Sequence, residues 1–323
     1  MTLFDKLARF DWVGGVLNGA VLVIFMIVLS FSGSVYAWNS GSAIALWVAF
    51  GVTLVVYVIQ QYCALSTTKE NRIFPVHFLR NRTMVLLFIA TAAAASAYEV
   101  TLYYIPLFFQ FTRGDSAIKA ALRLLPMICV FIFFVLVAGA TLPMSGRYNL
   151  FYIAGGPLIL IGGAFAFTID ADTAPAKIYG YEVLIAAGCG LVFQNAYAVA
   201  TALVPKHEES NALGFINVAQ IGTMAFGLSF AGCLFQNLGF KSLRTDLAPY
   251  GLPDEYVRSA LAGRISPVFS SGEEELIKIA VEAAASAIQK LFGMVIAGGA
   301  VVFVSGSLLP FKKLDLQAVA GGA

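Results

Sequence analysis

Charged residues are scarce in this sequence. Its 323 residues include 20 Lys+Arg and 18 Asp+Glu, so that 12% are charged, whereas 59% are hydrophobic. Soluble domains contain about 25% charged residues, and this deficit excludes a water-soluble globular protein. The formal net charge of +2 also excludes a nucleic-acid-binding protein, which would concentrate Lys and Arg on one face. We therefore expect no nucleic-acid partner.

Histidines and closely spaced cysteines are also rare. The two histidines, His77 and His207, lie in polar connectors, and the four cysteines lie far apart in apolar runs without a C-x-x-C pair. Metal sites and disulfide frameworks need closer spacings, so we expect four buried free thiols, no metal and no cofactor. The sequence also lacks G-x-S-x-G, H-E-x-x-H, Walker A and complete G-x-G-x-x-G motifs. These absences predict that the protein is not an enzyme.

Long apolar runs make up most of the chain. A membrane-spanning helix needs about 20 predominantly apolar residues, and eight segments meet this requirement. The runs are too long and continuous for barrel strands of about ten residues. We therefore predict an all-α, polytopic membrane protein with about eight transmembrane helices. The predicted spans are residues 12–32, 43–65, 84–110, 117–142, 149–169, 178–204, 211–237 and 288–310.

The basic residues in the short connectors predict the orientation. Ten lie on one side of the membrane, and the short loops on the other side contain only Arg113 and Lys177. Because positively charged loops stay in the cytoplasm, both termini are predicted to be cytoplasmic. The Asn81-Arg82-Thr83 glycosylation pattern then lies in the cytoplasm and should stay unmodified. The ten residues are Lys6, Arg9, Lys69, Arg72, Arg80, Arg82, Arg147, Lys206, Lys312 and Lys313.

Two connectors organise the chain. Residues 66–82 form a polar, basic stretch that separates the first two spans from the other six, and the long connector 238–287 separates the last two. Within the connector 238–287, the segment DEYVRSALAGRI is predicted to form a short helix. The run ELIKIAVEAAASAIQKLF is expected to begin outside and continue into the last span, with the acids before it near the positive end of the helix dipole.

Polar side chains inside the spans mark candidate functional positions, because at membrane depth they usually face a bundle interior or a watery cavity. The set comprises Glu99, Tyr103 and Gln110 on one stripe of the third span, Gln194 and Asn195 in the sixth, and Asn217 and Gln220 in the seventh. These residues either line a solute path or bond helix to helix. We interpret Glu99 as the one acid near the middle of a span, where it binds a proton or a cationic group, or bonds to a neighbouring helix.

Arg123 opens the fourth span together with Lys119. Long basic side chains at helix ends often extend to the membrane interface. The alternative is that Arg123 projects into an outward-facing cavity or pairs with an acid such as Asp115.

Several motifs occur in a fixed order along nearly the whole chain. They are Phe10–Gly14 (F-D-W-V-G), Phe78–Thr83 (F-L-R-N-R-T), Tyr103–Gln110 (Y-Y-I-P-L-F-F-Q), Gly114–Ala117 (G-D-S-A), Ala121–Pro126 (A-L-R-L-L-P), Gly188–Gly190 (G-C-G) with Gln194, and Gly239 after Phe235-Gln236-Asn237. Together they resemble the major facilitator superfamily, and within it the fourteen-span drug:proton antiporter class common among fungal toxin and multidrug efflux pumps.

The resemblance implies two six-helix halves, two linking helices between them, and a substrate bound between the halves. It assigns residues 1–66 to the two linking helices with a short cytoplasmic amino terminus. Residues 67–323 would form the carboxy-terminal six-helix bundle with the external loop 238–287. The first half, with its G-x-x-x-D-R-x-G-R-R loop, is missing from this sequence. We therefore expect a truncated product or a subunit that needs a partner half.

The leading interpretation is a transporter that exports a small organic molecule, a toxin or drug, in exchange for protons across the plasma membrane. Glu99, Tyr103, Gln110, Gln194, Asn195, Asn217 and Gln220 are the candidates for its substrate and proton pathway. Arg123 is assigned to a gate or to packing, and so is Arg147, because Ser145-Gly146-Arg147-Tyr148 resembles a weak echo of the missing loop. The expected partners are the solute, protons, the lipid bilayer, and a missing half or another transporter chain. The alternatives are a non-transporting structural or regulatory membrane subunit and an inactive gene fragment.

Overall fold

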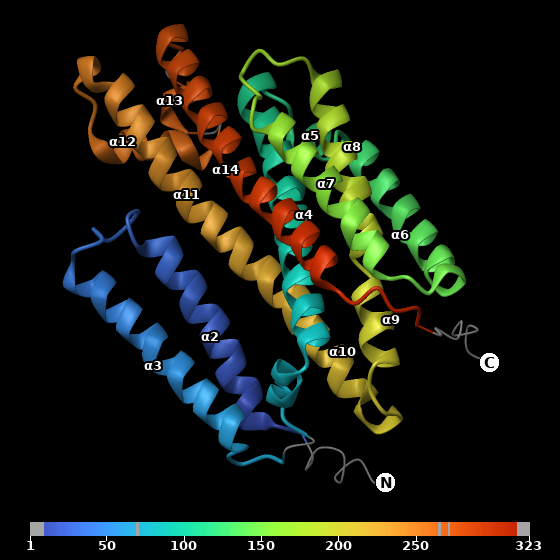
Figure 1. Ribbon diagram of the computed structural model, residues 1–323. Helices are drawn as coiled ribbons and strands as arrows, with labels where there is room; N and C mark the ends of the chain where they lie inside the picture. Colours follow the sequence, from blue (N-terminus) through green and yellow to red (C-terminus); the bar gives the residue numbers. More distant parts are fainter. Residues whose placement is uncertain (1–9, 69–70, 264–265, 271, 315–323) are drawn as a thin grey trace.

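The computed structural model describes residues 10–68, 71–263, 266–270 and 272–314. Eight helices in this part of the chain are long and apolar enough to cross a membrane. Within the same ranges, the one β-type pairing is an isolated bridge between Ser32 and Tyr36. The predicted all-α, polytopic membrane fold is therefore confirmed (Figure 1).

Five of the spans are single helices and three are interrupted. The single helices are α2 (Trp12–Phe31), α3 (Gly41–Cys63), α4 (Arg82–Arg113), α7 (Asn149–Ala166) and α14 (Glu274–Leu308). The interrupted spans combine α5 (Ala117–Leu122) with α6 (Leu125–Ser145), α8 (Pro175–Val192) with α9 (Asn195–Ala202), and α10 (Glu209–Asn217) with α11 (Thr223–Asp246). The last pair is joined by the π-helical turn η3 (Val218–Gly222).

Local sequence explains where several helices begin and end. Asn81 precedes α4, and its side-chain oxygen accepts hydrogen bonds from the backbone N–H groups of Thr83 (3.0 Å) and Met84 (3.4 Å). Such N-caps satisfy donors that have no partner within the helix. Gly114 and Gly146 end α4 and α6 with φ of 65° and 63°, a left-handed conformation that glycine adopts without steric cost.

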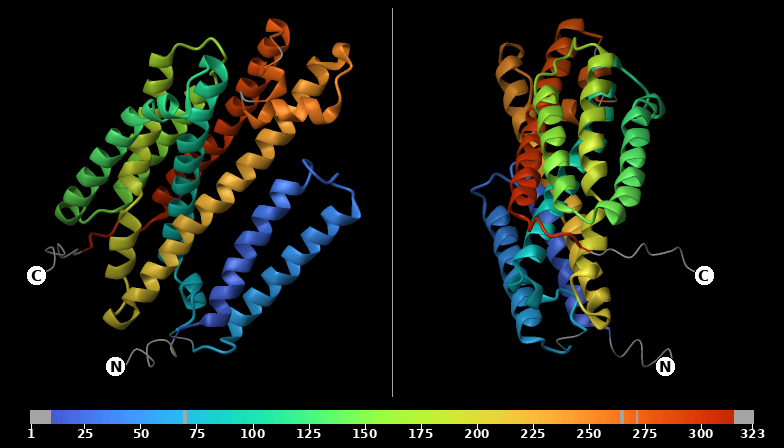
Figure 2. Two further views of the ribbon diagram at one scale, coloured as in Figure 1. Left: turned by 180° about the vertical axis from the view of Figure 1, so that it is seen from behind. Right: turned by 45° about the vertical axis from the view of Figure 1, so that its right-hand side comes forward.

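The six spans from α4 to α14 form one bundle. α14 packs against α4 and α7, α7 packs against α8, and α8 packs against α6 (Figure 2). Glycines bring the backbones of α7 and α8 into contact, since a Cβ atom added to Gly188 would lie 2.6 Å from the carbonyl oxygen of Gly155. Close approach of this kind is how helices associate in lipid, where the hydrophobic effect does not drive them together.

The α2–α3 hairpin lies beside α11 at one edge of the bundle (Figure 1). Its base is held by the buried carboxylate of Asp11, which accepts hydrogen bonds from Nε2 of Gln60 (3.0 Å) and Nε2 of Gln61 (2.9 Å). The same carboxylate accepts the backbone N–H groups of Gly14 (2.8 Å) and Ile73 (3.4 Å). A single side chain thus joins both helices of the hairpin to the connector that leads into α4.

Helices extend into the long connector from both ends, because α11 continues to Asp246 and α14 begins at Glu274. The connector contains the expected short helix, α12 (Asp254–Ser259), and α14 runs on into the last span as expected. All four cysteines are free thiols, but Cys63 and Cys129 are exposed rather than buried, because they lie on outer helix faces where no other helix packs.

Candidate functional site

A polar cluster joins α9 to the π-helical turn η3. The hydroxyl of Tyr197 donates to Oε1 of Gln220 (2.8 Å) and lies 3.1 Å from Oδ1 of Asn217. Nε2 of Gln220 in turn donates to the backbone carbonyl of Phe193 (2.9 Å). That carbonyl lies between the end of α8 and the start of α9. The two helix interruptions therefore face each other, and side chains form the hydrogen bonds between them. Such π-bulges occur frequently at functional sites.

The four amides predicted from the sequence have different surroundings. Gln220 (6% exposed) and Asn195 (2% exposed) are buried, and Asn195 donates to the carbonyl of Leu191 at 2.7 Å. Gln194 and Asn217 are exposed at the surface of the bundle. Hydrogen bonding within and between helices therefore accounts for the two buried amides, whereas Gln194 and Asn217 are exposed on their helices.

The stripe on α4 is also partly exposed. Tyr103 is 52% exposed, and Glu99 and Gln110 are half-buried. In the described part of the chain, Glu99 forms no ion pair. The ring of Tyr103 packs edge-on against that of Tyr104, with 5.1 Å between their centroids.

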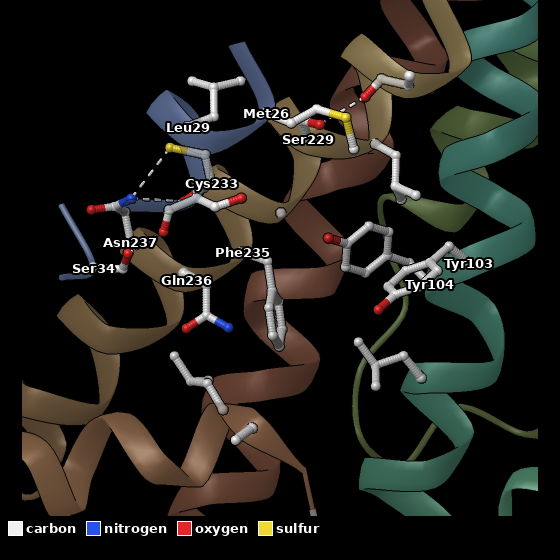
Figure 3. A pocket seen from close by; sticks show the side chains of 17 residues that line it. Met26, Leu29, Ser34, Tyr103, Tyr104, Ser229, Cys233, Phe235, Gln236 and Asn237 are labelled. Carbon is white, nitrogen blue, oxygen red and sulfur yellow. Dashed lines mark hydrogen bonds between the residues drawn. The ribbon is translucent and has the colours of Figure 1, made fainter. Parts of the chain in front are cut away.

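A cavity of about 530 Å³ lies between α2, α4 and α11. Figure 3 shows the side chains of Tyr103 and Tyr104 entering it from α4, facing those of Cys233, Gln236 and Asn237 on α11. The described residues that line it include no charged side chain. Among the candidates from the sequence, Tyr103 alone lines this cavity. The adjacent Gln236-Asn237 pair within a predicted span was the signal that could have identified the α11 wall.

A second cavity of about 380 Å³ lies further along the same junction between α2, α4 and α11. Asn18 from α2 and Asn217 and Thr223 from the α10–α11 span line it, together with Phe88 from α4. The amide of Asn217 therefore contributes to this cavity as well as to the Tyr197 cluster.

Arg123 forms an ionic cluster at the start of the α5–α6 span. Its Nε atom lies 2.5 Å from Oδ2 of Asp115, and its Nη1 donates to the hydroxyl of Tyr179 at 2.7 Å. The guanidinium also lies 4.3 Å from the ring centroid of Phe109, a cation–π geometry. Lys119 completes the cluster, with Nζ 2.8 Å from Oδ1 of Asp115. Of the alternatives open for Arg123, the pairing with Asp115 is observed, and Arg123 also lines a surface cavity of about 460 Å³.

The cluster shifts the titration of its carboxyl group. Burial raises the pKa of Asp115, but the hydrogen bonds and positive charges of Arg123 and Lys119 outweigh that effect, so the pKa lies below its ordinary value. Asp115 is therefore ionised at neutral pH. Arg147, the other basic candidate, is exposed in the turn after α6 and does not belong to this cluster.

Glu182 on α8 is an acid that the sequence analysis did not single out. Its side chain is 1% exposed, and neither carboxyl oxygen has a hydrogen-bond partner within the described residues. Glu182 is therefore more deeply buried than Glu99, although Glu99 lies nearer the middle of its span. The sequence placed Glu182 four residues after the start of a predicted span, where an acid is usually within reach of water.

The chain is similar to several fungal proteins of known sequence. No family model matches it. It is 36% identical over 312 residues to "Efflux pump patC" of Aspergillus clavatus, covering 97% of this chain and 57% of the relative. It is 35% identical to "MFS-type transporter patC" of Penicillium expansum, with the same coverage, and 35% identical to the "Phomenoic acid biosynthesis cluster MFS-type transporter" of Leptosphaeria maculans, covering 99% of this chain and 54% of the relative. The chain thus spans about half the length of the curated relatives it matches.

A solved structure shares the fold. The inward-facing, unoccupied form of a bacterial homolog to the human lysosomal transporter Spinster matches with a TM-score of 0.52 and 16% sequence identity. The match covers 94% of this chain and 66% of that one. The occupied form of the same bacterial protein matches with a TM-score of 0.53.

Proposed function

Because the chain belongs to the major facilitator superfamily, we propose that it provides one six-helix bundle of a transporter that exports a small organic molecule in exchange for protons. The relatives named efflux pumps support this proposal.

One observation carries the proposal, namely polar side chains on an open face at membrane depth. Tyr103, Gln194 and Asn217 are exposed there, and Glu99 and Gln110 are half-buried. Lipid cannot hydrogen-bond such groups, so they are stable only against water or another polar surface. We therefore assign this face to the substrate and proton pathway, with Asn195 and Gln220 supporting its backbone. A second six-helix bundle, from another part of a longer protein or from a partner chain, would close the pathway.

The remaining parts have separate roles in this proposal. Residues 1–66 provide two linking helices, and residues 67–323 provide the transporter bundle. Arg123, held by Asp115, and Arg147, in the turn after α6, act in gating or in packing. We place the protein in the plasma membrane with both termini in the cytoplasm, supported by the predicted excess of basic residues on that side.

Flux measurement in vesicles tests the proposal. The chain is purified from its native membrane with any polypeptide that remains bound, and is reconstituted with rhodamine 6G as the transported dye and pyranine as the internal pH indicator. We expect dye movement that depends on an imposed proton gradient and is lost in Glu99→Gln. The matched control is Glu282→Gln, an exposed acid on α14, which should transport normally. A complex that takes up no dye and moves no protons under a gradient contradicts the proposal and favours a structural subunit.

A further inference from the structure

Glu182 occupies the interior of the six-helix bundle. It lies seven residues after the start of α8 at Pro175, about 10 Å along the helix axis at 1.5 Å per residue. α8 packs against α4, α6 and α7. The side chain is 1% exposed and both of its oxygens lack a hydrogen-bond partner in the described structure. A carboxyl group here is removed both from water and from polar neighbours.

The surrounding helices supply no compensating charge. Between residues 125–145 and 149–166, α6 and α7 contain no charged residue. The charged residues of α4 are Arg82, Glu99 and Arg113, and the guanidinium of Arg113 donates to the backbone carbonyl of Thr173 (2.8 Å). Arg123 is held by Asp115 and Tyr179. None of the other titratable groups on these helices hydrogen-bonds Glu182. These groups are Tyr98, Tyr103 and Tyr104 on α4, Cys129 on α6, Tyr152 on α7, and Lys177, Tyr179, Tyr181 and Cys189 on α8.

An ionised carboxylate in such a place is strongly destabilised, because neither water nor a counter-charge replaces its hydration. A neutral, protonated carboxyl group avoids this cost. We infer that Glu182 carries a proton in this conformation and is a proton-binding site inside the six-helix bundle, separate from the open face that includes Glu99.

A proton fits this site and a metal ion does not. Metal cations such as Mg²⁺ and Ca²⁺ need six or more oxygen ligands, whereas no side chain or backbone group of the described residues hydrogen-bonds the oxygens of Glu182. The described residues also contain no group of three or more His, Cys, Asp or Glu side chains that could hold a metal. A lone carboxyl group binds a proton by forming one O–H bond. Release breaks that bond, transfers the proton to water and leaves a carboxylate, with no other reactant.

Release requires water to reach Glu182, and therefore a change in how α8 packs on its neighbours. The α7–α8 contact is built on glycine, with Gly155 and Gly188 in backbone contact and the side chains of Val192 and Ile159 packed against them, so these contacts must open before water reaches the carboxyl group. The idea that this proton is exchanged for the solute rests on the proposed function. The inference that Glu182 carries a proton is independent of that function.

Infrared spectroscopy of the purified full chain in lipid nanodiscs tests the inference without any transport. A protonated carboxyl group has a C=O stretching band that shifts in heavy water and that a carboxylate lacks. At pH 7 we expect this band in the wild type, its loss in Glu182→Gln, and its retention in Glu282→Gln, where the acid is exposed. If Glu182→Gln does not fold, Glu182→Asp should shift the band instead of removing it.

Two results would overturn the inference. One is a wild-type spectrum at pH 7 in which no band responds to either substitution at position 182. The other is a band that disappears when NaCl is added at constant pH, which would show that a sodium ion competes for the carboxylate. A persistent band in a protein that moves no dye would leave the proton site standing and reject the transport function alone.

Discussion

Gln220 and Phe193 connect two interruptions of the transmembrane helices through one hydrogen bond, 2.9 Å from Nε2 of Gln220 to the carbonyl oxygen of Phe193. The break between α8 and α9 leaves this carbonyl without its helical partner, and the π-helical turn η3 presents Gln220 to it. The side chain is 94% buried, and its Oε1 also accepts the hydroxyl of Tyr197. Both bent spans are therefore held in one arrangement by a single amide.

Replacing this amide should destabilise the bundle. Gln220→Leu leaves the Phe193 carbonyl without a partner, whereas the Tyr197 hydroxyl keeps Asn217, and an unsatisfied buried group costs about 1–3 kcal/mol. We expect a loss of about 1–3 kcal/mol in the free energy of unfolding, measured by denaturant titration in mixed micelles. Gln194→Leu is the matched control, since Gln194 is exposed, and should change stability by about 0.5 kcal/mol or less. Equal losses in the two variants would contradict the structural role of Gln220.

The sequence predicted the eight spans but not their interruptions. Length and hydropathy identify a span because the bilayer demands about 20 apolar residues, so the predicted 178–204 and 211–237 were continuous. The break after Val192 and the turn at Val218–Gly222 depend on which side chains meet across the bundle. Gln194, Asn195 and Gln220 marked these places as polar. Their pairing with Tyr197 and Phe193 requires the tertiary structure.

Burial of individual acids was the other part that sequence could not supply. Glu99 and Glu182 have the same side chain in similarly apolar helices, yet one is half-buried beside an open face and the other is 1% exposed. The difference arises from helix rotation and from which neighbours pack nearby. Neither property is encoded in the distance of a residue from the end of its span.

The Asp115–Arg123 pair predicts a pH-dependent stability. The pKa of Asp115 lies below its ordinary value, so its carboxylate stabilises the fold at pH values above about 4, the ordinary pKa of an aspartate. This contribution is lost as the pH falls through the lower pKa of the folded state. Asp115→Asn should therefore lower the melting temperature at pH 7, and its difference from the wild type should shrink as the pH is lowered below about 4.

Thermal unfolding between about pH 3 and pH 8 measures this difference. The range begins about one unit below the ordinary pKa of an aspartate and ends well above it. Asp172→Asn is the control, because Asp172 is exposed in the loop before α8 and its loss should not alter the profile. A destabilisation by Asp115→Asn that is equally large at both ends of the range would show that packing, and not the charge, explains the effect.

Because Gly155 and Gly188 are in contact, we expect that one methyl group added at Gly188 pushes α7 and α8 apart. The Cβ atom of Gly188→Ala would lie 2.6 Å from the Gly155 carbonyl oxygen and 2.8 Å from the backbone nitrogen of Ile159. Since backbone atoms cannot rotate away, the helices must move apart, and overpacking of this kind costs about 1–3 kcal/mol. Gly180→Ala in the same helix meets nothing within 4 Å and should be neutral, or stabilising by up to about 1 kcal/mol. Denaturant titration of both variants checks this contrast. A neutral Gly188→Ala would mean that the interface is looser than the structure shows.

Cys63 allows the proposed orientation to be examined with its native thiol. It is exposed at the last position of α3, the end proposed to lie in the cytoplasm. A membrane-impermeant maleimide should therefore label Cys63 only after cells are permeabilised. Asn39→Cys, in the exposed turn before α3, should be labelled in intact cells when Cys63 is replaced by Ser. Labelling of Cys63 in intact cells would reverse the assignment.

Asp11 predicts how the α2–α3 hairpin stays attached. Its carboxylate accepts the backbone N–H of Ile73 (3.4 Å) as well as the side-chain amides of Gln60 and Gln61. Asp11→Ala removes all of these acceptors, and buried hydrogen bonds to a charged group are worth about 1.5–3 kcal/mol each. We expect faster amide hydrogen exchange at Ile73, because the connector loses its attachment to the hairpin. Ser40→Ala is the matched control: it removes the N-cap of α3, which accepts only the N–H of Ala43 (3.2 Å). It should cost about 1 kcal/mol and leave exchange at Ile73 unchanged. If both variants left Ile73 equally protected, other contacts would hold the connector, and Asp11 would act only as the N-cap of α2.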